Sequence, residues 1–242
     1  MPTPIFLSPA LPSELLSYIL DHHIYPSTLI ICSSQAEFLD SLVEDVRKQL
    51  HKNTRNIDQE EPHGCEPSHS QHPEEEEKHA LLSSPLYQVA TSRHIRVIYV
   101  PTVTHLRAYL SVFSPAESRV PVPPNYTLTG DNKTPHIILY GFLGLHRDTS
   151  EWSAQGLSNT ISTLVEVVHR LSWGGILIEP RIDSCDPALE ELLQETVPIL
   201  NGGARNLGSG FENGAWTGRT VEVGRILGRW CRFQRAQWDV SK

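Results

Sequence analysis

The sequence predicts an α/β fold, in which helices flank a mostly parallel sheet and an antiparallel hairpin ends the chain. Three observations support this prediction. Short apolar runs alternate with segments whose apolar residues have helical spacing, as is typical of parallel sheets. The apolar runs are continuous, as in strands that are buried on both faces. The chain has 242 residues, of which 39% are hydrophobic, so it can bury a core. We therefore expect one domain over residues 1–242.

Four apolar runs are the expected parallel strands. Each is rich in Ile, Leu and Val and has the length of an ordinary strand. Pro101 ends the second run, because proline has no N–H to continue a hydrogen-bonded ladder. The four runs are residues 28–32, 95–100, 136–140 and 176–178.

Segments beside these runs have apolar residues three and four positions apart, which predicts helices. Ser34 and Glu37 form a capping box at the start of one of them. Asp186-Pro187 is typical of another helix start, with aspartate as the cap and proline in the first turn. The expected helices cover residues 13–20, 34–50, 103–113, 157–171 and 186–197.

The last quarter of the chain predicts a loop followed by a hairpin. Residues 201–218 contain six glycines and few apolar side chains, which indicates a long flexible loop. Residues 220–226 and 229–238 then read as two strands, with Leu227-Gly228 as the tight turn between them.

Residues 51–86 break the alternation, because they are rich in His, Glu, Pro and Ser and almost free of apolar side chains before Leu81. We expect this segment to be a disordered acidic insertion in the domain. Its histidines and single cysteine also suggest a metal site, but their spacing fits no closed tetrahedral template, so we expect none. The residues concerned are His63, Cys65, His69, His72 and His79.

Composition argues against several classes of protein. No apolar run approaches the length of a membrane span, and the first residues have neither a basic stretch nor a long apolar one, so we expect no membrane segment and no secretory signal. The four cysteines are scattered without a CxxC pair, which favours a reducing compartment over a disulfide framework. They are Cys32, Cys65, Cys185 and Cys231.

An unrecognised enzyme stays open as an alternative, although we expect no catalytic residue and no cofactor. The chain has no Gly-x-Ser-x-Gly elbow and no cysteine in a recognisable nucleophile context. Glu179, at the end of the fourth expected strand, is a catalytic candidate by position. An ion pair between Glu179 and a neighbouring arginine, such as Arg181, is the favoured interpretation.

Basic charge gathers at the C-terminal end, whereas the whole chain has a formal net charge of −8. Residues 201–242 hold seven Lys or Arg against three acids, a net of +4. A glycine-rich loop can lay its backbone against phosphate, so the arginines in and after it are candidate nucleic-acid contacts. A hairpin with solvated arginines is the alternative. The candidates are Arg205, Arg219, Arg225 and Arg229.

Two tryptophans, Trp152 and Trp173, flank the longest expected helix. Large aromatic side chains are enriched at protein interfaces, so both are candidate contacts to a partner subunit. They are equally suited to a core.

The order of these pieces resembles the RecA-like core of recombinases and their paralogs. The run Arg96 to Val100 with Thr102 looks like the second core strand and the start of its helix. His136 to Tyr140, with the helix from 158 to 171, looks like the Walker B strand and the helix after it. The glycine-rich residues 201–218 fall where the family has its second DNA-binding loop.

The departures from the family concern ATP. A P-loop needs glycines and a lysine after the first strand, since their amides and ammonium hold the phosphates. Here the run ending at Cys32 continues as Ser33-Ser34-Gln35-Ala36-Glu37, and the Walker B position reads Tyr140-Gly141 without an acid. The resemblance therefore implies a pseudo-ATPase that acts by binding.

Within the family, the segment Pro135 to Leu171, an apolar strand followed by a polar loop and a long helix, looks most like ATP-site-deficient subunits of the Shu complex, of the Csm2 type. That resemblance implies a nuclear, non-catalytic subunit that assists homologous recombination and DNA repair. It would bind a RecA-like sister subunit as a heteromer and bind DNA weakly and non-specifically. The second choice is a RecA-like accessory subunit of the Elongator complex, which works on wobble uridines of transfer RNA in cytoplasm and nucleus.

Overall fold

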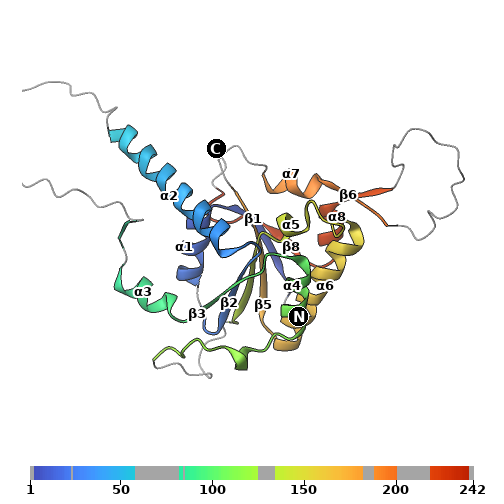
Figure 1. The fold of residues 1–242 in the computed structure, drawn as a ribbon, viewed down its shortest axis with the longest axis horizontal. Coiled ribbons are helices and arrows are strands. Elements are labelled where there is room, and N and C mark those ends of the chain that lie inside the picture. The colour runs from blue at the N-terminus through green and yellow to red at the C-terminus, as the bar shows by residue number, and fades with distance from the viewer. Residues whose placement is uncertain are drawn as a thin grey trace, which may run out of the picture.

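A computed structural model describes residues 3–22, 24–57, 82–83, 85–124, 134–181, 188–200 and 219–239. Its centre is a sheet with helices on both faces, as Figure 1 shows. The α/β prediction is therefore confirmed.

The central sheet has six strands in the order β3-β2-β4-β5-β1-β8, and every neighbouring pair is parallel. The four apolar runs expected as strands all lie in it. The strands are β1 (Ile5–Ala10), β2 (Ser27–Ile31), β3 (Ile95–Tyr99), β4 (His136–Tyr140), β5 (Gly174–Pro180) and β8 (Arg232–Gln234).

Alternate residues of these strands point to two separate cores. In β4, for example, Leu139 faces one core and Tyr140 the other. Helices α1 (Pro12–His22) and α2 (Gln35–Ile57) cover the Tyr140 side. Helices on the other side cover the larger core around Leu139, namely α4 (Val103–Ser111), α5 (Phe142–His146), α6 (Ala154–Leu171), α7 (Leu189–Gln194) and α8 (Val223–Leu227).

Smaller elements complete the described chain. Helix α3 (Leu86–Ser92) precedes β3 and has no buried residue, and a 3-10 turn, η2, covers Pro115–Glu117. Strands β6 (Thr196–Pro198) and β7 (Thr220–Glu222) form a separate antiparallel pair. In the described ranges no helix is long and apolar enough to cross a bilayer.

The antiparallel pair near the C-terminus is not made of the strands that the sequence suggested. Residues 223–227 form α8 instead of extending a strand, because Val223, Ile226 and Leu227 bury one helical face. The expected second strand shrinks to β8, which pairs in parallel with β1. The prediction of a hairpin turning at Leu227-Gly228 was therefore wrong.

Two further corrections concern the first hundred residues. The first strand along the chain is β1, which was not among the expected strands. It lies inside the sheet, between β5 and β8. The first residues of the expected insertion 51–86 are helical, since α2 continues to Ile57, and Leu86 at its end is the first residue of α3. Residues 58–81, with the candidate metal ligands, lie outside the described residues.

Candidate functional site

The junction between β1 and α1, which we call the β1–α1 corner (residues 10–14), is where a P-loop would follow the first strand. Only Leu11 separates the two elements. The amide of Leu11 donates to the Glu14 carboxylate at 2.7 Å, and the amide of Ser13 donates to the buried Asp45 at 3.0 Å. Amides at a helix N-terminus are ready anion donors. In this protein, the carboxylates of Glu14 and Asp45 accept hydrogen bonds from the amides at the start of α1.

Tyr140 of β4 and Arg181, which follows β5, close the same corner. The Tyr140 hydroxyl donates to the carbonyl of Ala10 at 3.0 Å, and the amide of Arg181 donates to that carbonyl at 2.9 Å. Nη2 of the Arg181 guanidinium donates to both carboxylate oxygens of Glu14, at 2.6 and 2.8 Å. Arg181 thus pairs with Glu14, and the expected ion pair with Glu179 was wrong.

Glu179 anchors the start of α5 instead. Its carboxylate accepts hydrogen bonds from the amides of Leu143 at 2.7 Å and Gly144 at 3.3 Å. Burial raises the pKa of Glu179 to about 7, although these two bonds oppose the rise. The acid therefore positions a helix, and no other titratable side chain within the described ranges hydrogen-bonds to it.

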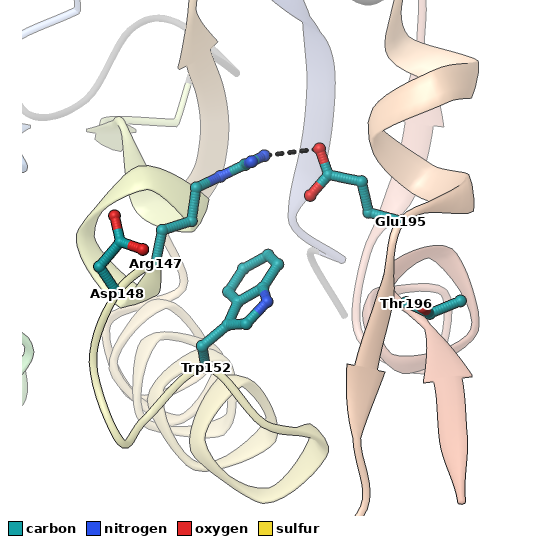
Figure 2. A pocket seen from close by; sticks show the side chains of 5 residues that line it. All are labelled: Arg147, Asp148, Trp152, Glu195 and Thr196. Carbon is teal, nitrogen blue, oxygen red and sulfur yellow. Dashed lines mark hydrogen bonds and ion pairs between the residues drawn. The ribbon is translucent and has the colours of Figure 1, made fainter. Parts of the chain in front are cut away.

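An open pocket of about 360 Å³ lies between the α5–α6 loop and β6, as Figure 2 shows. The Arg147 guanidinium sits 5.2 Å from the Trp152 ring centroid and pairs with Glu195 at 2.7 Å. Asp148, whose φ is 56°, and Thr196 complete the lining. Trp152, a predicted interface residue, is half-buried and lines this pocket.

A buried hydrogen-bond relay holds the loop that carries the pocket. Arg107 on α4 donates to the Thr160 hydroxyl at 2.8 Å and pairs with Glu151 at 2.5 Å. The fully buried His146 lies 2.9 Å from the same hydroxyl and 2.8 Å from the carbonyl of Phe142. Since that carbonyl only accepts, Nδ1 of His146 carries a proton, and Nε2 of the neutral ring faces the Thr160 hydroxyl as an acceptor. The same hydroxyl also lies 3.1 Å from the carbonyl of Gly156, so its one proton is shared between two acceptors.

The described residues on either side of 201–218 are held by hydrogen bonds. Gln155, at the start of α6, exchanges two hydrogen bonds with the backbone of Leu200, at 2.9 and 3.0 Å. The carbonyl of Arg219 accepts from the amide of Ile199 at 2.8 Å. Leu200 and Arg219 are thereby fixed to α6 and to the end of β6.

Three of the four candidate arginines lie within the described residues 219–229. Arg219, Arg225 and Arg229 are exposed, and Arg225 and Arg229 stand four residues apart on α8 and just after it. Within the described ranges no carboxylate pairs with these three. Arg205 lies outside the described residues.

Trp173 occupies a different environment from Trp152. It is only 7% exposed, and its ring packs edge-on against Phe113 at 5.8 Å. This position favours the core interpretation of Trp173 over the interface one.

Sequence reasoning missed the residues that close the β1–α1 corner. Glu14 carried a weak signal, as an acid in the first turn of an expected helix. Asp45 carried none, because its partner Ser13 is 32 positions away.

In comparisons with known proteins, no family model and no curated protein matches the chain. Across the described ranges, no three His, Cys, Asp or Glu side chains are grouped to hold a metal ion.

Proposed function

We propose that this protein is a non-catalytic, RecA-like subunit of a complex that assists homologous recombination and DNA repair. In this role it binds a RecA-like sister subunit and makes weak, non-specific contacts with DNA. It acts as a scaffold and as a binding surface, without ATP chemistry.

The architecture is compatible with the RecA-like assignment. Strands and helices alternate along the chain, and the six strands form one parallel sheet with helices on both faces.

The closed β1–α1 corner is the observation that carries the proposal. Nucleotide phosphates need free amides and a cation at this point. Here the amides of Leu11 and Ser13 are taken by Glu14 and Asp45, and the nearby cation, Arg181, is neutralised by Glu14. Two carboxylates at the phosphate position would repel a polyanion.

A binding experiment with a fluorescent ATP analogue and Mg²⁺ tests this part. We expect no saturable binding by the purified chain. A micromolar dissociation constant that unlabelled ATP competes away would contradict the pseudo-ATPase assignment.

The exposed arginines support the DNA-binding part, because the net charge of −8 requires any polyanion to meet a local basic surface. We expect Arg225→Gln with Arg229→Gln to weaken binding to single-stranded and duplex DNA equally. The slope of log affinity against log salt should become shallower by about 1.5 to 2. Arg47→Gln, at an exposed position of α2, is the matched control and should leave the slope unchanged.

Affinity purification of the tagged full chain with mass spectrometry identifies the complex. Recombinase paralogs among the enriched proteins support the proposal. Elongator subunits would overturn it in favour of the second choice, in which the same arginines contact transfer RNA. Turnover of a small molecule by the purified chain would show an enzyme instead.

A further inference from the structure

The outer edge of β3 has few of the features that usually prevent strands from pairing with another chain. β3 is the first strand in the sheet order, so among the described residues one of its sides has no neighbouring strand. It contains no proline, its one charged residue is Arg96, and its register with β2 is unbroken from Ile95 to Tyr99. Its middle residue, Val97, is 42% exposed. Natural edge strands are commonly protected by charges, prolines or bulges.

The hydrogen-bond pattern shows which backbone groups are available at this edge. The amide of Val100 donates to Ile31 of β2, so alternate residues before it, Ile98 and Arg96, also bond toward β2. The N–H and C=O groups of Ile95, Val97 and Tyr99 therefore point outward. In the described part of the chain, no backbone hydrogen bond from another segment reaches them.

Apolar side chains are also exposed beyond both ends of β3. Helix α3 leads into the strand and buries none of its residues, although it is too short to be stable alone in water. Helix α2 begins beside the end of the strand, where the rings of Phe38 and Tyr99 lie 6.2 Å apart. The exposed side chains are Leu86 (84%) and Val89 (37%) on α3, and Leu39 (43%) and Val43 (46%) on α2.

We propose that two copies of this chain form a two-fold dimer in which their β3 strands pair antiparallel about Val97. Ile95 then lies opposite Tyr99 of the second copy, and the outward backbone groups of both strands bond to each other. The α3 helix of each copy comes to the end of β3 where α2 of its partner begins, which brings the exposed apolar side chains together. The two sheets become continuous.

Charge favours a second copy as the occupant of this edge. In a two-fold pair about Val97, the single residue that faces its own copy is uncharged, so no like charges are opposed. Residues 80–92 contain no charged side chain either, in a chain with a net charge of −8. Arg96 is held away from the axis, with its guanidinium 5.5 Å from the ring centroid of Tyr109.

Sedimentation of the purified full chain over a range of concentrations tests the dimer, which does not rest on the proposed function. We expect a monomer–dimer equilibrium. Val97→Lys opposes two ammonium groups and should weaken dimerisation about fivefold or more, and Val97→Glu should do the same. An equimolar mixture of the two variants should dimerise again, because unlike charges then face each other. Val112→Lys, at a 69% exposed valine after α4, is the control and should dimerise normally.

Three results would overturn the proposal. The first is a parent chain that stays monomeric at all concentrations. The second is a dimer whose affinity neither Val97 variant changes. The third is an equimolar mixture of the two variants that stays monomeric although each variant keeps the parent's melting temperature. If the Val97 variants fold poorly, Leu86→Ser with Val89→Ser decides instead. Neither residue is buried, so that variant should fold normally and dimerise more weakly. An undiminished dimer would then overturn the proposal.

Discussion

Glu179 and His146 are buried at the two ends of α5, and burial shifts their pKa values in opposite senses. It raises the pKa of Glu179 to about 7 and lowers the pKa of His146 below its ordinary value. The folded state therefore holds the Glu179 proton more tightly than the unfolded state, and the His146 proton less tightly. Protonation in acid stabilises the fold through Glu179 and destabilises it through His146.

Glu179→Gln is the first residue-scale prediction. Between the ordinary glutamate pKa and about 7, the folded chain keeps a proton that the unfolded chain has lost, so Glu179 makes stability fall as pH rises through this window. Glutamine removes that fall and still accepts an amide hydrogen bond. Melting temperatures between pH 5 and 8 should decline less for the variant than for the parent. Glu44→Gln, at an exposed site, should follow the parent.

Thr160→Val tests the relay beneath the pocket. Valine keeps the shape of threonine but leaves Arg107 Nε and His146 Nε2 without their shared partner. We expect a loss of about 1–3 kcal/mol in the free energy of unfolding, measured with urea. Thr163→Val on the same helix removes an exposed hydroxyl that bonds only to the carbonyl of Asn159, and should change stability little. Equal losses in both variants would argue against the relay.

At the scale of elements, the strands that the sequence predicted best are those whose residues are apolar and buried throughout. The strands β2, β4 and β5 are continuous apolar runs, and the sequence predicted them. β1 was missed because Ser8 and Pro9 interrupt its apolar character, although Ser8 is buried and its hydroxyl donates to Asp239. β8 has three residues, all exposed, and it lies within the longer strand that was predicted over 229–238. The prediction paired that strand antiparallel in a hairpin, whereas β8 pairs in parallel with β1.

The start of α6 packs tightly against the loop before it, which gives an element-scale prediction. A side chain at Gly156 would collide with the backbone of Glu151, whereas one at Gly144 on α5 would meet nothing. Gly156→Ala should therefore cost about 1–3 kcal/mol through forced movement of the loop. Gly144→Ala should be neutral or stabilise the protein by about 0.5–1 kcal/mol, since alanine suits a helix better. Urea unfolding of both variants measures the contrast, and a neutral Gly156→Ala would contradict the packing.

At the scale of the whole molecule, the candidate site was only partly predictable. Trp152 and the exposed arginines were found because aromatic and basic residues stand out in a sequence. The β1–α1 corner was not predicted, because residues 28–32 read as the first strand and the P-loop position was therefore expected after Cys32. Where a P-loop would lie depends on which strand comes first in the sheet, and that was decided by the unrecognised β1.

Residues 58–81 supply a whole-molecule prediction that rests on composition. They contain eight acids and one lysine, with little apolar content to offset the entropy of ordering. A Gly-Ser linker in their place, joining Ile57 to the residues before α3, should leave the melting temperature nearly unchanged. A large decrease, or a parent whose melting temperature rises with added zinc, would show that the segment contributes to the fold.

The interior position of β1 also governs when the protein can fold during synthesis. Ile5 pairs with Ile176 on one side and with Arg232 on the other. β1 thus leaves the ribosome first among the strands of the sheet, and both its neighbours leave last. Contacts so distant in sequence slow folding and leave apolar segments exposed while they wait. The sheet can therefore be completed only after β8 has emerged.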